Sequence, residues 1–526
     1  MFKKINTTIL IFLTAFSAIK LKAQQADSTN ILPAYITLFG YNALWYNGNN
    51  AAGLRQDSIL TFGKTKLGFD QMQGQFKLAQ QAKDSQRLNF ESERFQNIGK
   101  TLFYGKFSYT QQWDKQLRFS DVLDPYRGTP YLLADSIGGD WKKQLYALTL
   151  KAASPALLNN KLTFGLGTTL NVATGARQND PRPLSTSNQI TIAPSATWKL
   201  NKSNLIGLNG WYSRYREDIS LEVKNSSINY SLYKSLGLGQ LELPTTFTTG
   251  ASRIYKGNKW GGNIQYQLKN NTITWLNNFG YRTYQEQVAD GTSVPRKSGT
   301  WKQTAYSFNS NLNIGNKNFL HRFALTLQRL EDQGIEFHEF YNTSLKAWQT
   351  LLEAEFYLAE TDQASLSYTL IKPNKEHVFN WLAEIGGSYY STNKSYLLPA
   401  SSQVISNAGI WLKGTKVWSF NRNTNLQTGV TALYNQNLNQ SLSYIPITGD
   451  RTLLAREVLY PDHDYLSSNF IATTVNLQID FKVEKVKNVR FLIAGSVSNQ
   501  HSLTTNIYPN ATGNRNYWSF SLGALY

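Results

Sequence analysis

The feature that most constrains the fold is a two-residue alternation of apolar and polar side chains that recurs along most of the chain. Segments such as 162–172, 190–200 and 471–481 carry large apolar residues on one face and mainly Gly, Ser, Thr or Asn on the other. A β-strand sends successive side chains to opposite faces, so each segment predicts a strand with one apolar face. Their length of about 9–13 residues matches a tilted strand that crosses a lipid bilayer.

A secreted soluble β-protein is the alternative, because a β-sandwich shows the same alternation. The solvent-facing side of a sandwich normally carries many Lys and Glu residues, whereas here only 17% of all residues are charged. Small polar side chains suit the crowded or watery interior of a barrel. We therefore predict an all-β fold, namely a transmembrane antiparallel β-barrel of the outer-membrane type. The chain has no cysteine, which excludes disulfide scaffolds and thiolate metal sites.

The turns predict the number of strands. Short polar turns such as 159–161 and 421–423 alternate with long irregular segments, as in outer-membrane barrels with short periplasmic turns and long outer loops. We expect 16–18 strands and favour 18, because an even number returns the C-terminus to the periplasm. The segment 346–376 leaves the number open, since Ala347 to Glu360 would make an additional strand. The long segments are 113–141, 174–187, 217–247, 286–298, 331–345, 391–403, 437–465 and 502–514.

The N-terminal residues have the pattern of a secretory signal peptide. Lys3 and Lys4 precede an apolar run from Ile9 to Ile19, which is too short to span a bilayer. The sequence Leu21-Lys22-Ala23 then resembles a cleavage site, so the mature chain is expected to begin at Gln24. The predicted organisation is a signal peptide at 1–23, an N-terminal periplasmic or lumen segment at 24–62, and a transmembrane barrel at 63–526.

The last strand has the pattern of an assembly signal. Trp518, Phe520, Leu522 and Tyr526 alternate on one face, and the sequence ends on the aromatic residue. Such a strand is typical of the signal by which outer-membrane barrels are recognised for assembly. It predicts localisation in a bacterial outer membrane.

Three segments in the first third of the chain resemble a known family. They are residues 43–54 (ALWYNGNNAAGL), residues 103–109 (FYGKFSY), and Asp124-Pro125-Tyr126 followed by residues 131–136 (YLLADS). These segments resemble an uncharacterised barrel family of Bacteroidota outer membranes, a domain of unknown function. The resemblance implies an outer-membrane barrel encoded beside TonB-dependent transporters and surface lipoproteins, and it supplies no functional residues.

The chain is not expected to be a TonB-dependent transporter itself. Such a transporter needs a large plug domain and a 22-stranded barrel, whereas only about 40 residues precede the first expected strand here. The predicted function is a non-enzymatic accessory component of a cell-surface uptake complex, with a TonB-dependent transporter or a surface lipoprotein as partner. Loops 113–141, 217–247 and 437–465 contain tyrosines that suit a protein-binding surface. The alternative is that these loops fold inward and close the lumen.

Two further functions remain alternatives. One is a stand-alone channel for small or hydrophobic solutes, because the sequence leaves open whether the lumen is open or plugged. The less favoured one is a barrel hydrolase, for which Asp462, His463 and Asp464 form the nearest local cluster. This cluster also has the composition of a weak metal site, but a solvated loop is the simpler interpretation. No cofactor and no structural or catalytic metal are predicted.

The net charge of +19 is scattered along the sequence. There is no Lys/Arg cluster and no recognition helix, so nucleic-acid binding is not expected. Basic loop residues are expected to contact the anionic headgroups of outer-membrane lipids. Lys106, Lys151, Arg322 and Arg490 lie at predicted inward positions and are candidate basic residues of the lumen, where they would favour anions.

Overall fold

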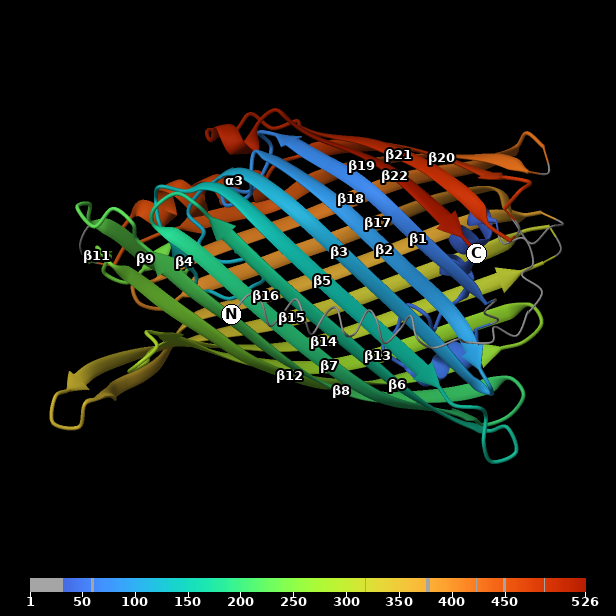
Figure 1. Cartoon of the computed structure of the whole chain (residues 1–526), viewed down its shortest axis with the longest axis horizontal. Coiled ribbons are helices and arrows are strands. Elements are labelled where there is room, and N and C mark those ends of the chain that lie inside the picture. Colours follow the sequence, from blue (N-terminus) through green and yellow to red (C-terminus); the bar gives the residue numbers. More distant parts are fainter. Residues whose placement is uncertain are drawn as a thin grey trace.

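The computed structural model describes residues 32–57, 61–316, 318–374, 379–421, 423–447, 451–486 and 488–526. Within these residues, 18 antiparallel strands form one closed sheet (Figure 1). The barrel strands are β1 (Phe62–Gly74), β2 (Asp84–Ile98), β3 (Thr101–Leu117), β5 (Gly139–Ala153), β6 (Leu162–Arg177), β7 (Arg182–Lys199), β8 (Asn204–Glu222), β12 (Gly250–Lys269), β13 (Ile273–Asp290), β14 (Arg296–Gly315), β15 (Leu320–Asn342), β16 (Ala347–Pro373), β17 (Phe379–Tyr396), β18 (Ser401–Ser419), β19 (Thr424–Ser443), β20 (Phe470–Lys482), β21 (Arg490–Ser502) and β22 (Asn514–Leu525).

The ring closes between the first strand and the last, since β1 pairs with β22 from Lys64↔Leu525 to Gly74↔Arg515. Closure leaves no unpaired strand edge, which a lipid bilayer requires. The predicted fold class and the favoured number of 18 strands are confirmed. The segment 346–376 contributes one strand, β16, which pairs with β15 from Ala347 to Ile371. Among the described residues, the helices are all too short or too polar to cross a membrane.

Shorter elements lie in the connections and before the first strand. The strands β4 (Leu133–Ala134), β9 (Tyr230–Gly237), β10 (Gln240–Leu241) and β11 (Thr245–Phe247) form a small second sheet. The helical elements are α2 (Pro33–Asn42), η1 (Ala51–Arg55), η2 (Ala455–Leu459), α3 (Tyr460–Leu466) and η3 (Pro509–Ala511).

The apolar face of the strands points outward and forms a band around the barrel. Leu208, Ile264, Phe279, Phe308 and Leu327 are direct partners across five neighbouring strands, and all but Phe308 are among the most exposed large apolar side chains. A soluble protein avoids such continuous exposed apolar surface, whereas a lipid-facing barrel wall requires it.

Four connections predicted to be long are short, because their flanking strands extend further than expected. These four short connections are 178–181, 291–295, 343–346 and 397–400. Beyond the apolar band the outward residues become polar, whereas inward residues such as Ile219 and Val288 are apolar, so the pattern of an apolar outer face is lost while the backbone pairing continues. The connections that remain long are 118–138, 223–249, 444–469 and 503–513. They lie at one end of the barrel, the loop end, together with the four short connections just named. The remaining hairpins, such as 200–203 and 270–272, lie at the other end, the turn end.

Candidate functional site: a lumen closed at both ends

The chain before β1 lies inside the barrel at the turn end. We call its described part, residues 32–57, the lumen segment. The Asn50 side-chain amide donates to the Gln265 side chain at 3.1 Å, and the Ala52 N–H donates to Ser195 Oγ at 3.1 Å. The Lys151 ammonium group donates to the carbonyl oxygen of Tyr46 at 2.9 Å. These contacts fix the lumen segment to β5, β7 and β12.

The helix α2 fixes the same segment to the other side of the wall. The Lys413 ammonium group donates to the Tyr41 hydroxyl at 2.9 Å, and the Arg322 guanidinium lies 5.0 Å from the centre of the Tyr41 ring. Ala34 packs in a small apolar cluster with Ile371, on β16, and with two residues of β17. The lumen segment therefore contacts both sides of the wall and crosses the lumen.

Trp45 locks the lumen segment into the wall, and two glycines make room for its ring. A Cβ atom at Gly53 would lie 2.1 Å from a ring carbon of Trp45, and one at Gly207 would lie 2.7 Å from another. Trp45 is almost fully buried. Residues 43–54, one of the segments that carry the family resemblance, thus pack against the wall, as α2 does.

Long connections close the loop end. Connections 118–138 and 223–249 and the described residues of 444–469 fold into the barrel mouth, and their apolar residues share one buried cluster with aromatic residues of the wall. From the connections this cluster takes Val122, Tyr131, Leu133, Leu232, Leu236, Leu238, Ala455 and Leu459, and from the wall it takes Tyr255, Tyr284, Trp301, Tyr357 and Tyr396 among others. We call these three connections the loop plug.

Ion pairs with little exposure fasten the loop plug. Arg127 forms a bidentate pair with Glu286 on β13, with nitrogen–oxygen distances of 2.6 and 2.8 Å, and its guanidinium lies 4.6 Å from the centre of the Tyr255 ring. Lys234 on β9 pairs with Asp290 at 2.7 Å, a carboxylate that Arg253 also contacts.

A second set of ion pairs fastens connection 118–138 to β6. The buried Arg177 guanidinium pairs with Asp121 at 3.2 Å and with Asp135. Breaking such a pair leaves an uncompensated charge in a buried site, which is costly. Connection 118–138 is therefore held to the wall by Arg127 on one side and by Arg177 on the other.

The prediction of an exposed aromatic loop surface is wrong. Tyr131 and Tyr230 are buried, and Tyr233, Tyr444 and Tyr460 are half-buried. Tyr126 alone of these six is exposed, at 37%, and its hydroxyl donates to Asp462. The loops fold inward because the aromatic wall residues at the barrel mouth bury the apolar side chains of the loops, which would otherwise be exposed to solvent. The inward folding of the loops, which the sequence left as the alternative, is what the structure shows.

The described residues line at least two cavities inside the barrel. One of about 420 Å³ lies beside α2, and neutral polar side chains such as Thr415, Gln427, Asn476 and Ser519 line most of it. The other, of about 310 Å³, lies under the loop plug. Its polar lining residues include Tyr390, Lys394, Gln403 and Asp462. A small solute that entered the lumen would occupy these spaces, which lie between the lumen segment at the turn end and the loop plug at the loop end.

The four predicted lumen basic residues lie at inward positions, and each has a partner. Lys106 pairs with Glu91 at 2.9 Å, and Arg490 pairs with Asp480. Lys151 and Arg322 hold the lumen segment, as described above. Sequence reasoning missed Tyr41, Lys413, Arg127 and Arg177, because their partners lie far away in the sequence.

Asp462, His463 and Asp464 lie together on α3, but each has a different partner. Asp462 accepts a hydrogen bond from the Ala79 N–H at 2.6 Å, and burial raises the pKa of its carboxyl group to about 6. His463 Nδ1 lies 3.2 Å from the Gln403 amide, and Asp464 accepts from the Ile507 N–H at 3.2 Å. Within the described residues, no group of three His, Cys, Asp or Glu side chains has metal-binding geometry. The three residues join α3 to neighbouring connections and to β18.

The turn at the end of the lumen segment should respond to pH through Asp57. Its carboxylate accepts the N–H groups of Trp45 at 3.1 Å and Tyr46 at 3.0 Å, and burial raises its pKa to about 7. A free Asp titrates near about 3.9, so between these values the docked segment holds a proton that the released segment loses. The lumen segment is therefore bound most strongly to the barrel wall in acid, and its binding weakens as the pH rises from about 4 to 7. Hydrogen exchange of the amides of residues 44–57 at pH 5 and pH 8, corrected for intrinsic rates, should show greater protection at pH 5.

The variant Asp57→Asn is the control for this effect. Its amide oxygen accepts the same two hydrogen bonds but does not titrate, so the protection should lose its pH dependence. Protection that increases from pH 5 to pH 8 in the wild-type protein would contradict the assignment.

The comparisons with known proteins bear on the family and leave the activity open. Residues 51–526 match the model of a family of unknown function, DUF6850. The chain belongs to this family. No curated protein matches the sequence. Among solved structures, the RagAB peptide transporter is similar with 9% identity and a TM-score of 0.42, covering 88% of this chain and 86% of that one.

Two other solved structures show similar low identities. A FadL homologue from Pseudomonas aeruginosa has 12% identity and a TM-score of 0.32, and the match covers 91% of this chain and 92% of that one. BauA, the ferric preacinetobactin receptor from Acinetobacter baumannii, has 7% identity and a TM-score of 0.38, with coverages of 89% and 80%. The assignment of this protein as an outer-membrane type of barrel is based on its own closed sheet and on the apolar band of its outer face.

Proposed function

We propose that the protein is a non-enzymatic component of an outer-membrane uptake assembly, whose barrel is closed at rest and whose loop end docks a partner. The partner is a TonB-dependent transporter or a surface lipoprotein, and the loop end faces the cell exterior. Two closures made by the chain itself, the lumen segment and the loop plug, argue against a passive open pore. A closed barrel can contribute to uptake in two ways. A partner protein opens the barrel, or the barrel holds the partner protein in place.

The observation that supports binding of a partner protein is a hairpin that projects beyond the rim of the barrel. Strands β15 and β16 continue past the rim at the loop end, as Figure 1 shows in yellow at the lower left. Residues 334–336 are buried against the barrel, whereas residues 337–353 are all half-buried or exposed. We call residues 337–353 the rim hairpin.

One face of the rim hairpin presents two large, exposed apolar side chains and lacks acidic, lysine and arginine side chains. Phe340 and Leu352 lie on this face, together with His338 and Gln349, and are 41% and 50% exposed. The other face is partly covered, because the Lys297 ammonium lies 5.0 Å from the Phe337 ring centre and the Lys297 N–H donates to Glu339. A projecting apolar face at the loop end, with Leu351 exposed beside it, is typical of a protein-docking surface.

The test removes the apolar character of this face. The double variant Phe340→Asp/Leu352→Asp should lose the partner in mild-detergent purification followed by quantitative mass spectrometry. Each central anchor residue of an interface contributes about 2 kcal/mol or more, so the recovery of partner should fall at least about 30-fold. A supporting result requires that the protein lost is identified as an outer-membrane transporter or a surface lipoprotein.

Val294→Asp is the matched control. Val294 lies in the 291–295 connection at the same end of the barrel and is 41% exposed, like Phe340, so its change to Asp should leave the partner bound. Equal recovery with the double variant and the control would show that the rim hairpin is not the docking site. A wild-type monomer that purifies alone and conducts ions steadily in a planar bilayer would instead identify a stand-alone channel, for which the polar cavity beside α2 is the supporting observation.

A further inference from the structure

The outer wall of the barrel has an aromatic line where the apolar band ends toward the loop end. Tyr212, Trp260, Tyr281 and Tyr306 lie on four neighbouring strands, β8 and β12 to β14, and all point outward. The line shifts by two residues in register between β12 and β13, as the tilt of the strands requires. Tyr and Trp side chains prefer the interface between lipid tails and headgroups, so this line marks the headgroup level of the membrane.

Immediately beyond the aromatic line the outward residues become polar. Arg214, Asn258, Thr283 and Thr304 are the next outward residues on the same four strands, and Lys256 and Lys302 follow one outward position further. At about 3.3 Å per residue, these side chains start roughly 7–14 Å past the aromatic rings along the strands. This is where lipid headgroups lie.

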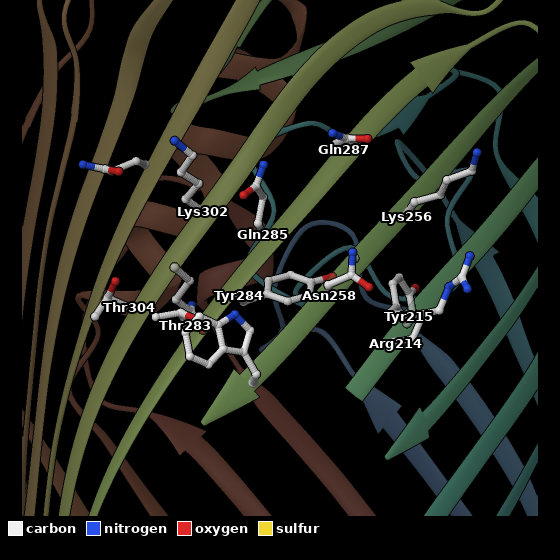
Figure 2. A pocket seen from close by; sticks show the side chains of 14 residues that line it. Arg214, Tyr215, Lys256, Asn258, Thr283, Tyr284, Gln285, Gln287, Lys302 and Thr304 are labelled. Atoms are coloured by element: carbon white, nitrogen blue, oxygen red, sulfur yellow. The ribbon is translucent and has the colours of Figure 1, made fainter. Parts of the chain in front are cut away.

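These residues line a hollow of about 690 Å³ on the barrel wall. Figure 2 shows the side chains of Arg214, Lys256, Gln285, Gln287 and Lys302 standing on adjacent strands around it. Three cations and several side-chain amides thus surround one space, and Trp260 also lines it.

The three cations are available to a ligand. Arg214, Lys256 and Lys302 are exposed, and none of their side chains has an ion-pair or hydrogen-bond partner among the described residues. The nearby acids are occupied: Asp218 forms a bidentate pair with Arg216 at 2.6 and 2.7 Å, and Glu331 pairs with Arg329 at 3.0 Å. The lining of the hollow itself contains no carboxylate.

A second hollow at the loop end shows that this charge pattern is specific to the first. It lies near the loop ends of β1, β2 and β3, and its lining includes Lys83 and Lys115 but also Asp84 and Asp140. Lys115 lies 3.7 Å from Asp84. Its charges are balanced, whereas those of the first hollow are all positive.

We propose that the hollow between β8 and β15 binds the phosphorylated headgroup of an outer-leaflet lipid. The Arg and Lys side chains pair with phosphate oxygens, the amides of Asn258, Gln285 and Gln287 donate hydrogen bonds to the sugar or phosphate oxygens, and Trp260 contacts the start of the acyl chains. The position beside the aromatic line identifies a membrane lipid as the source of the phosphate. This inference depends on the loop end facing outward and is independent of any partner protein.

The test measures the binding of lipid A, a phosphorylated glycolipid of bacterial outer membranes, to the detergent-solubilised full-length protein. Native mass spectrometry and Trp fluorescence are the two readouts. Bis-phosphorylated lipid A should bind with high affinity, and chemically dephosphorylated lipid A much more weakly. Each basic side chain near an anionic lipid contributes about fivefold, so Arg214→Gln/Lys256→Gln/Lys302→Gln should weaken binding roughly 100-fold.

The matched control is Lys161→Gln/Lys202→Gln/Lys485→Gln, which removes the same charge from exposed turn-end residues and should bind like the wild-type protein. Equal affinities of the two triple variants would overturn the proposal, as would equal affinities for the two forms of lipid A. Full competition by inorganic phosphate at concentrations similar to those of lipid A would show that the site takes a free anion, which also overturns the lipid assignment. The gel mobility of unheated samples verifies that both triple variants are folded barrels.

Discussion

Replacement of Arg127 by Ala should release connection 118–138 from the barrel mouth. Arg127 is the bidentate partner of the fully buried Glu286 carboxylate, and its Nε lies 3.8 Å from Glu217. Without the guanidinium these two carboxylates stay buried without their cation, which costs about 3–5 kcal/mol. Hydrogen exchange or limited proteolysis of residues 118–138 should therefore increase by roughly two orders of magnitude or more.

Two other variants separate the buried ion pair from a general effect of charge. Arg216→Ala breaks an ion pair with Asp218 whose two side chains are 40% and 38% exposed. The free energy that holds the loop plug should therefore change by at most about 1 kcal/mol. Arg127→Ala/Glu286→Gln removes one of the uncompensated charges and should restore part of the protection. If Arg127→Ala and Arg216→Ala increase exchange equally, the ion pair does not hold the loop plug.

The same variant tests whether the lumen segment by itself blocks conduction. The lumen segment still crosses the lumen in Arg127→Ala, held by Trp45, Lys151 and Lys413. We therefore expect little steady current from this variant alone in a planar bilayer. A large current would show that the lumen segment does not seal the turn end, and the protein would then be gated by its loops alone.

The barrel was predictable from the sequence because two different environments act on the two faces of each strand. Leu208 and Ile264 face lipid, and Asn209 and Gln265 on the same strands face the lumen, so the alternation is present in the sequence itself. Beyond the bilayer this difference disappears. There β15 and β16 continue with polar and apolar residues mixed on both faces, and the sequence pattern predicted a loop for residues 331–345.

The contents of the lumen were not predictable, because they depend on pairs that are distant in the sequence. Arg127 meets Glu286 across 159 residues, and nothing near Arg127 distinguishes it from a solvated loop arginine. The tight fit of Trp45 depends on the absence of a side chain at Gly207, a position that reads as an ordinary strand glycine. Asp462 and His463 show the opposite case, since they are close in sequence but bind different neighbours.

Replacement of Leu522 by Arg should lower the amount of folded barrel. Leu522 lies on the outward face of β22, where its direct partners are Leu67 on β1 and Ile493 on β21. All three are exposed apolar side chains within the lipid-facing band, at the seam that closes the ring. An Arg facing the middle of the bilayer costs about 2–4 kcal/mol. Since β22 must pair on both edges to close the barrel, this cost acts on the last step of assembly.

Ser521→Arg places the same side chain on the opposite face of the same strand. Ser521 points inward and lines the polar cavity beside α2, so the guanidinium can reach water and polar groups there. The fraction of protein that migrates as the compact unheated form on a gel should therefore fall sharply for Leu522→Arg and only slightly for Ser521→Arg. Equal losses for the two variants would mean that the outward face of β22 does not meet lipid. The lipid-facing assignment of Trp518 and Phe520, which share that face, would then also be wrong.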